Sequence, residues 1–299
     1  MQASADCIPC VLRQALSAAR RVTDDPWLQR KLLFAVMEKL PALNFDRSPA
    51  EVSYDTLRFA AKYLGVADPF QGDKTLHNEK MAAIENDMRE AVRAADDPLR
   101  QALLFALAGN IIDLGILDPQ DIEARLFRDA RTLEPAIDDY EALRAALRGA
   151  RSVLYLLDNA GEVVCDKLVI EQLGVHDITC VVRRSPIIND VTRKDVQAVG
   201  LERLAKIVDI GADALGVPLN LCSAEFRETF AGADVVLAKG QANFETLDEA
   251  PRPVFHVLRA KCAHMADHLD VPPGAAVIVR TPREEDTESP SEGKSPRQS

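Results

Sequence analysis

The chain changes character near residue 150, and this change limits the fold more than any other feature of the sequence. Before it, apolar residues recur at spacings of three and four, which is the pattern of amphipathic helices. Pro or Asp stands at several of the expected helix starts. The expected helices cover residues 11–20, 27–40, 50–64, 73–94, 98–114, 121–128 and 140–148. No strand is needed before Ser152, so the first half predicts an all-α domain.

After residue 150, short continuous apolar runs alternate with segments long enough to form a helix. Such runs are typical of parallel strands whose sheet is covered by helices on both faces. The runs cover residues 153–157, 178–182, 207–208, 235–237 and 277–279. We expect an α/β fold in which an all-α N-terminal domain, residues 1–149, precedes a Rossmann-like three-layer parallel-sheet domain, residues 150–281. Residues 282–299 lack an apolar anchor that could offset their ordering entropy, which predicts a disordered tail.

The composition excludes several classes of protein. A formal net charge of -11 disfavours nucleic acid or an anionic membrane as a partner, because most of the surface would repel either one. No apolar stretch reaches the roughly 18 residues of a membrane span, and the N-terminus lacks the features of a signal peptide. We therefore expect a cytoplasmic protein. Its six cysteines are then expected to be reduced thiols rather than a disulfide framework.

Polar residues stand directly after three of the expected strands, where an open parallel sheet binds its ligands. The first cluster runs from Asp158 to Glu162, and Gly161 in it permits a tight turn into a helix whose N-terminal amides face an anion. The second cluster contains Asn189 and Asp190. Because both clusters follow strands of one sheet, we expect their side chains to share one rim.

The third cluster begins with Lys239 and Gly240 and includes Asn243. A lysine at this place supplies a compact positive charge for a phosphate oxygen, and Gly240 permits close approach of the backbone. Asn243 can donate or accept a hydrogen bond nearby. One Asp at a strand end is often only a helix cap, but three polar clusters on one rim favour a catalytic site.

The rim also offers hard oxygen ligands for a divalent cation. Asp158 and Asp190 supply carboxylates and Asn159 supplies an amide carbonyl, a set that suits Mg²⁺ or Mn²⁺. Sites of this kind keep positions open for water and a substrate phosphate. A cation and Lys239 together would neutralise a transferring phosphoryl group, so the pattern indicates phosphoryl chemistry.

These clusters resemble the damage-control phosphatase family, formerly a domain of unknown function, in its prokaryotic branch with an N-terminal CxxC. The order and the separation of the three clusters both fit the family. Further family-like positions lie at residues 7–10, 68–74, 109–113 and 260–262. The resemblance thus extends over nearly the whole chain, and only the acidic tail falls outside it.

The resemblance implies a helical N-terminal domain, a Rossmann-like catalytic domain that binds metal, and a metal-dependent phosphatase that acts on small phosphorylated metabolites. It assigns the cation, Mn²⁺ or Mg²⁺ with Co²⁺ or Ni²⁺ as alternatives, to Asp158, Asn159 and Asp190. The family's Arg-Thr-x-Lys substrate motif is absent, and Lys261 is the residue expected to take over part of its role. The expected catalytic residues are Asp158, Asn159, Glu162, Asp190 and Lys239, and the expected substrate-binding residues are Asn110, Asn189, Lys239, Asn243 and Lys261.

Two routes for the reaction remain open at this point. Water can attack phosphorus in line, with Glu162 as base and Lys239 stabilising the developing charge. Alternatively, Asp158 can act as a covalent nucleophile. The chain lacks the Asp-x-Asp arrangement of haloacid-dehalogenase-type phosphatases, because Ala160 stands two residues after Asp158. Attack by water is the favoured route.

Three other classes of protein compete with this interpretation. The first two are a non-catalytic nucleotide- or cofactor-binding domain and an S-adenosylmethionine-dependent methyltransferase, since Rossmann-like folds serve both. The third is a redox or iron–sulfur protein centred on Cys7 and Cys10, with Cys262 as a further ligand. Asn110 and Asp113 interrupt an apolar helix and face either the active site or a buried structural partner. The sequence leaves open the substrate, the preferred metal, the role of the cysteine pair and the oligomeric state.

Overall fold

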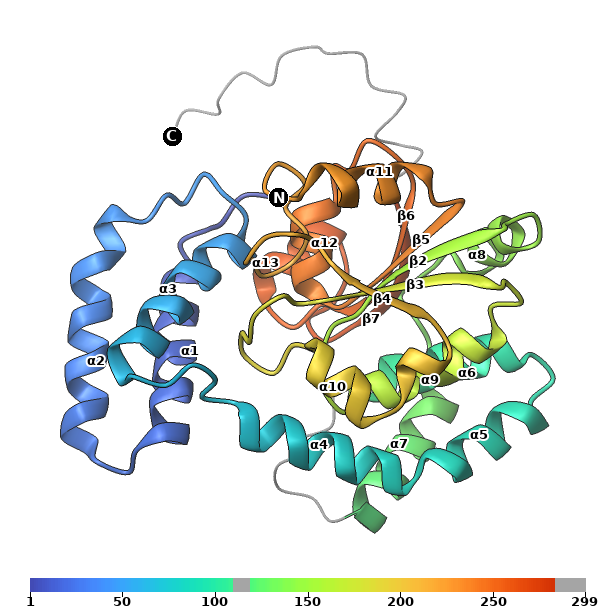
Figure 1. Cartoon of the computed structure of the whole chain (residues 1–299), viewed down its shortest axis with the longest axis horizontal. Helices are drawn as coiled ribbons and strands as arrows, with labels where there is room; N and C mark the ends of the chain where they lie inside the picture. Colours follow the sequence, from blue (N-terminus) through green and yellow to red (C-terminus); the bar gives the residue numbers. More distant parts are fainter. Residues whose placement is uncertain (110–118, 283–299) are drawn as a thin grey trace.

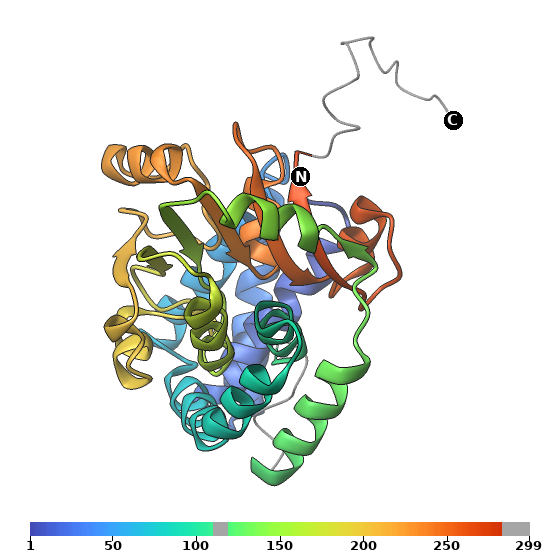
Figure 2. The same ribbon diagram turned by 90° about the vertical axis from the view of Figure 1, so that its right-hand side faces the viewer.

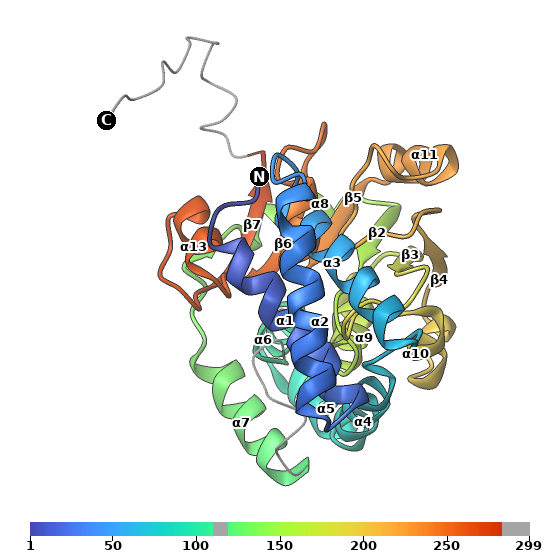
Figure 3. The same ribbon diagram turned by 90° about the vertical axis from the view of Figure 1, so that its left-hand side faces the viewer.

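The computed structural model describes residues 1–109 and 119–282 of the chain. Its first part is a group of three helices at one side of the molecule, α1 (Cys7–Val22), α2 (Pro26–Lys39) and α3 (Pro49–Leu64) (Figure 1, Figure 3). A capping box begins α3, because the hydroxyl of Ser48 accepts from the amide of Glu51 while the carboxylate of Glu51 accepts from the amide of Ser48. The group has its own apolar core, to which Ala15, Ala19, Leu32, Val36 and Ala60 belong.

The next helices lead the chain from this group to the sheet. They are α4 (Gln71–Ala83), α5 (Glu85–Ala94), α6 (Pro98–Gly109), α7 (Pro119–Thr132) and α8 (Tyr140–Leu147), and a short 3-10 helix, η1 (Leu40–Ala42), precedes α3. Residues of α5 and α6 share one large hydrophobic core with the sheet and with α9 (Glu162–Gln172). Helices from the first half of the chain therefore form part of the layer that covers one face of the sheet.

The sheet has seven strands in the order β1-β7-β6-β5-β2-β3-β4. Their bounds are β1 (Ile137–Asp138), β2 (Ser152–Leu156), β3 (Asp177–Val182), β4 (Lys206–Asp209), β5 (Val235–Lys239), β6 (Val254–Arg259) and β7 (Ala276–Thr281). All neighbouring pairs are parallel except β6 and β7. The chain runs outward from β2 through β3 to β4 and then returns to β5 on the other side of β2. The carboxyl ends of β2 and β5 therefore form a topological switch point.

Helices cover both faces of this sheet. The remaining ones are α10 (Arg193–Ala198), η2 (Leu201–Arg203), α11 (Ala224–Gly232), α12 (Gln241–Leu247) and α13 (Ala263–Leu269). Figure 2 shows α11, in orange, on one side of the strands, and α6 and α9, in teal and yellow-green, on the other. A second hydrophobic core lies under α11, where Phe226 and Phe230 pack on strand residues such as Leu154 and Val236. The expected α/β fold with three layers and a helical N-terminal region is confirmed.

Three details differ from the sequence-based expectations. The first half does contribute a strand, because Ile137 and Asp138 pair with β7 at the sheet edge. A strand at residues 254–259 was not expected, and β7 runs antiparallel to it, so the sheet is mostly rather than fully parallel. The single helix expected over residues 73–94 is broken at Ile84, whose φ of -108° and ψ of 8° leave the helical region. This break lets α4 and α5 take different directions while Ile84 stays buried.

Two further expectations concern the ends of the sequence. The tail predicted over residues 282–299 lies, apart from Pro282, outside the described residues. The division into domains at residue 149 stays a prediction. Within the described ranges, no helix combines the length and the apolar character that crossing a bilayer requires.

Candidate active site

Backbone hydrogen bonds join the two loops that carry the expected carboxylates. The loop after β2 and the loop before α10 form an isolated antiparallel bridge between Asn159 and Asp190. The amide of Val191 donates to the carbonyl of Asp158 at 2.8 Å, and the amide of Ala160 donates to the carbonyl of Asn189 at 2.9 Å. This pairing is what brings Asp158 and Asp190 together from positions that are 32 residues apart in the sequence.

The carboxylates at this rim are buried, and they repel one another. Asp158 is 5% exposed, Asp190 is 1% exposed and Glu162 is 2% exposed. Burial, followed by the charges of Glu162 and Asp190, raises the pKa of Asp158 to about 7. Burial also raises the pKa of Asp190, against the opposing effect of Arg183. A cluster of buried acids with this electrostatic balance gains stability when a cation binds, because the cation offsets the repulsion.

Asn159 connects two of these acids. Its side-chain nitrogen donates to Asp158 Oδ2 at 2.6 Å and to Glu162 Oε2 at 3.2 Å. Both carboxylates are thereby held by one amide group. The amide oxygen of Asn159 is the remaining donor atom of the expected metal-binding set.

Arg183, which the sequence analysis did not single out, fixes Asp190 from behind. Its Nε donates to Asp190 Oδ2 at 2.7 Å, and its other two nitrogens donate to the carbonyl of Gly216 at 2.8 Å and to Asn243 Oδ1 at 2.9 Å. All three nitrogens of the buried guanidinium are therefore satisfied, and Asp190 keeps one orientation. The signal in the sequence was one of two consecutive arginines, Arg183 and Arg184, directly after β3, which is not distinctive.

Lys239 is buried rather than displayed on the rim. The side chain is 0% exposed and forms ion pairs with Glu162 and with Asp166, the second at 2.9 Å. Tyr155 donates its hydroxyl to Asp166 at 2.7 Å and completes the network. Burial alone would lower the pKa of Lys239, but Asp166 and Glu162 together raise it, so the lysine stays charged. In this arrangement Lys239 holds Glu162, while its expected contact with phosphate stays a prediction.

Gly240 and Asn243, the other residues of the third cluster, help to fix the loops that carry the acids. Gly240 has a φ of 78°, and the carboxylate of Asp158 occupies the space that a Cβ atom at this position would need. Only glycine fits there without displacing the acid. The buried Asn243 donates to the carbonyls of Leu157 and Lys239, at 3.1 and 2.7 Å. It therefore ties the ends of β2 and β5 to each other.

Helix α4 contacts the loop after β2 through side-chain hydrogen bonds. Asn78 accepts a hydrogen bond from the amide of Gly161 at 2.7 Å and donates to Asp195 at 3.3 Å. Lys74, only 1% exposed, pairs with Asp68 at 2.8 Å and with Asp195 at 3.5 Å. The family-like segment near residue 70 therefore contacts the loops of the site, although its side chains do not line the cavity.

A cavity of about 620 Å³ opens above these carboxylates. Its floor includes Asp158, Asn159, Asn189 and Asp190, and Lys261 lies beside them. Glu162, Lys239 and Asn243 are not among the lining residues. Another wall comes from α3 and from α1 with its N-cap, and it includes Asp6, Cys7, Pro9, Cys10, Arg13, Gln14, Pro49, Ala50 and Ser53. The expected substrate-binding residue Asn110 lies outside the described residues, as does Asp113.

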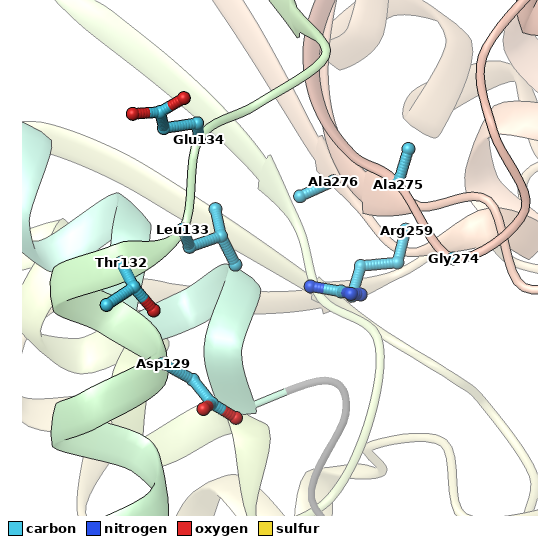
Figure 4. Close-up of a pocket in the computed structure, with 8 residues that line it drawn as sticks. All are labelled: Asp129, Thr132, Leu133, Glu134, Arg259, Gly274, Ala275 and Ala276. Atoms are coloured by element: carbon cyan, nitrogen blue, oxygen red, sulfur yellow. The ribbon is translucent and has the colours of Figure 1, made fainter.

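A second cavity, the second hollow, has a volume of about 390 Å³ and lacks a group of acids that lie close together. It lies between α7 and the turn before β7, with Arg259 reaching into it (Figure 4). Its two acidic side chains, Asp129 and Glu134, lie apart from each other (Figure 4). The cavity over the strand ends is therefore the candidate active site.

The donor atoms at the floor fit a hard divalent cation. In residues 1–109 and 119–282, no three His, Cys, Asp or Glu side chains are grouped so that they alone could hold a metal ion. The expected set instead combines two carboxylates, Asp158 and Asp190, with the amide of Asn159. Oxygen-only sets of low ligand number are characteristic of Mg²⁺ and Mn²⁺ sites that share the cation with a substrate phosphate.

Comparisons with known proteins show the family to which the chain belongs. The family model described as a damage-control phosphatase ARMT1-like domain matches residues 3–277. A protein named damage-control phosphatase PH1575, from Pyrococcus horikoshii, is 34% identical over 94% of this chain and 98% of its own length. A damage-control phosphatase from Archaeoglobus fulgidus is 31% identical over 93% of this chain and 98% of its own length. The crystal structure of the Pyrococcus protein, described as a DUF89 family protein, superposes with a TM-score of 0.87 at 32% identity and covers 94% of this chain and 99% of its own.

Proposed function

Because this chain belongs to the damage-control phosphatase family, we propose that it is a divalent-metal-dependent phosphatase that hydrolyses phosphomonoesters of small metabolites. The observation that carries the proposal is the convergence of Asp158, Asn159 and Asp190 on the floor of one cavity. The same family is expected from the sequence clusters at these strand ends, and the family is confirmed.

The cation is proposed to be Mn²⁺ or Mg²⁺, held by Asp158, Asn159 and Asp190. When bound, it would polarise the phosphoryl group and lower the pKa of a water molecule. The protein's part is to fix the ligands. Arg183 holds Asp190, Asn159 bridges Asp158 and Glu162, and Gly240 leaves room for the Asp158 carboxylate.

Lys261 is the better placed of the two lysines to bind the substrate phosphate. It is exposed, lines the cavity and forms no ion pair with any described residue. Burial dominates the raised pKa of Asp158, and the charge of Lys261 opposes it, which places the ammonium group near that carboxylate. Lys239, by contrast, is enclosed by two acids. We therefore assign phosphate binding to Lys261 and the positioning of Glu162 to Lys239.

The reaction is proposed to proceed by attack of water on phosphorus, which releases an alcohol and inorganic phosphate. Asp158 is buried under Asn159 and Gly240, and this supports a role as ligand rather than as nucleophile. Glu162 hydrogen-bonds to Asn159 and is held by Lys239, and it is the proposed base, acting through Asn159 because it does not itself line the cavity.

The test is release of phosphate from p-nitrophenyl phosphate and a panel of sugar phosphates, with EDTA or with added Mg²⁺, Mn²⁺, Co²⁺ or Ni²⁺. Release that needs the cation and is lost in Asp158→Ala and Asp190→Ala supports the proposal. Asp129→Ala, in the second hollow, is the matched control and should keep full activity. Activity that is indifferent to both substitutions at the floor, or absent with every cation, would refute the phosphatase assignment and favour a cofactor-binding protein.

A further inference from the structure

Each of the two loops that carry the expected metal ligands runs directly into a helix. Asp158 and Asn159 stand three and two residues before Gly161, which is the N-cap of α9. Asp190 stands two residues before Thr192, which is the N-cap of α10. Because so few residues separate each ligand from a helix start, the relative placement of the two helix starts sets the relative placement of the ligands.

One side chain from α4 contacts both helix starts. Asn78 is 5% exposed and lies on α4, which packs against α9 and α10 (Figure 1). Its Oδ1 accepts from the amide of Gly161 at 2.7 Å, and its Nδ2 donates to Asp195 Oδ1 at 3.3 Å. The other oxygen of Asp195 accepts from the amide of Thr192 at 2.9 Å. The side-chain amide of Asn78 therefore joins the start of α9 to the start of α10.

Helix α9 depends on this contact because it lacks a capping box of its own. In a capping box, the N3 side chain reaches back to the N-cap amide, as Asp195 does for Thr192 in α10. In α9 the N-cap is Gly161 and the N3 residue is Val164, and neither has a polar side chain. Asn78 thus supplies from another helix the acceptor that α10 supplies from within.

The contact through Asn78 adds to the backbone bridge between the two loops. The bridge joins them at the ligands themselves, where the amide of Val191 donates to the carbonyl of Asp158. Hydrogen bonds tolerate some bending, so this link alone leaves the loops able to rotate about it. The second link lies farther along both segments and limits the rotation. Lys74 pairs with Asp195 at 3.5 Å and keeps this acid beside α4.

We propose that Asn78 is a positioning residue of the metal site: by joining the starts of α9 and α10, it holds Asp158 and Asp190 at the separation that one divalent cation requires. The inference rests on the cation site of the proposed function and deepens it, because it adds a residue from the first half of the chain to that site. Asn78 is not among the residues that line the cavity, so it acts only through the two loops. Groups that orient metal ligands in this way contribute strongly to metal affinity.

The first experiment measures binding of Mn²⁺ alone to the full chain by calorimetry, in wild type and in Asn78→Ala. The dissociation constant should rise by about 10- to 100-fold, the usual effect of losing a group that orients a metal ligand. In the p-nitrophenyl phosphate assay, the Mn²⁺ concentration that gives half-maximal activity should rise by the same factor. The kcat at saturating Mn²⁺ should stay within about threefold, because the bound cation then draws the ligands together.

Met81→Ala is the matched control for a loss of stability. Met81 lies on the same helix, one turn after Asn78, and is fully buried in the large core. The substitution should lower Tm at least as much as Asn78→Ala, because it leaves a cavity. Its dissociation constant for Mn²⁺ should stay within about twofold of wild type, since the loops keep their hydrogen bonds. An equal loss of Mn²⁺ affinity in both variants would mean that Asn78 acts through stability alone, which overturns the inference.

A double variant tests the contact itself. Asn78→Asp combined with Asp195→Asn exchanges donor and acceptor across the same contact and preserves the net charge. The exchanged pair still offers an acceptor to the amide of Gly161 and another to the amide of Thr192. The double variant should bind Mn²⁺ within about threefold of wild type. A loss as large as that of Asn78→Ala overturns the inference.

The Mn²⁺ measurements also separate this inference from the proposed function. If wild type binds Mn²⁺ but hydrolyses no phosphate ester, and Asn78→Ala binds Mn²⁺ more weakly, the proposed function fails while the role of Asn78 stands. Equal affinity in wild type and Asn78→Ala overturns the inference, whether or not the ester is hydrolysed. Wild type that binds no Mn²⁺ overturns both.

Discussion

The floor and the α1 wall of the cavity are built in opposite ways. At and beneath the floor the buried charged groups are paired, as with Arg183 on Asp190 and Lys239 on Glu162 and Asp166. On the wall, Arg13 has no ion pair and Gln14 Oε1 has no donor among the described residues. The charges at the floor are therefore held in place before a ligand arrives, whereas Arg13 on the wall is exposed to solvent.

This difference matters for catalysis. A reacting group needs fixed ligands and fixed charges, because reorganisation during the reaction raises the barrier. Substitutions at the floor should then change both stability and kcat, and substitutions on the exposed wall should change stability little.

The largest effect is expected at Asp190. Asp190→Asn keeps the shape of the side chain but removes one negative charge from the cation site and from Arg183. We expect kcat/KM to fall on the order of 10³-fold and the affinity for Mn²⁺ to fall with it. Activity is measured over a titration of Mn²⁺, and Asp129→Asn is the control. Unchanged affinity for Mn²⁺ would show that Asp190 is not a ligand.

The two lysines provide the sharpest comparison of buried and exposed charge. Lys239→Met removes the cation that pairs with the buried acids Glu162 and Asp166 and should lower the free energy of unfolding by about 3 kcal/mol or more. Lys261→Met removes an exposed cation and should change stability by less than about 1 kcal/mol while raising KM. Chemical denaturation and steady-state kinetics measure both. If Lys239→Met leaves stability intact and raises only KM, Lys239 is the phosphate ligand that the sequence predicted.

Glu245 lies where the helical group meets the sheet region, and its titration should make the stability of the protein depend on pH. Burial raises its pKa to about 7, against hydrogen bonds from Gln241 and from the backbone of Ala50. Between pH 4.5 and 7 the folded protein keeps a proton on Glu245 that the unfolded chain releases. The protonated carboxyl therefore stabilises the fold at low pH, and this stabilisation is lost as the pH rises through about 7. Glu245→Gln cannot ionise, so it should avoid this loss and raise the free energy of unfolding by roughly 1 to 3 kcal/mol at pH 8. Equal slopes of stability against pH in both proteins would contradict this.

The smallest effect is expected for the cysteine pair. Cys7→Ser combined with Cys10→Ser keeps small polar groups on the wall and should change kcat/KM by less than about threefold, because neither thiol is assigned a contact with the reacting phosphate. Absorption spectra of the purified wild type should show no visible band. A brown protein, or activity abolished by the double substitution, would support the iron–sulfur or redox alternative.

The fold was largely predictable because its signals are local. Continuous apolar runs identified most strands, and spacing identified the helices. The strand β6 was missed because His256 interrupts its apolar run, and β1 was missed for a different reason. β1 is two residues long and is defined by pairing with β7, a partner far away in the sequence. The break at Ile84 was missed because the apolar spacing continues across it.

Sequence alone predicted that Asp158, Asn159, Asp190 and Lys239 follow or end strands of one parallel sheet, since the carboxyl ends of such strands share one rim. Tertiary structure decided which of them face the cavity. Lys239 turns inward because Glu162 and Asp166, more than 70 residues earlier in the sequence, lie beneath it. The wall of α1 and the cation Lys261 reach the same cavity only through folding. Burial and ion pairing depend on such distant contacts, which no local pattern records.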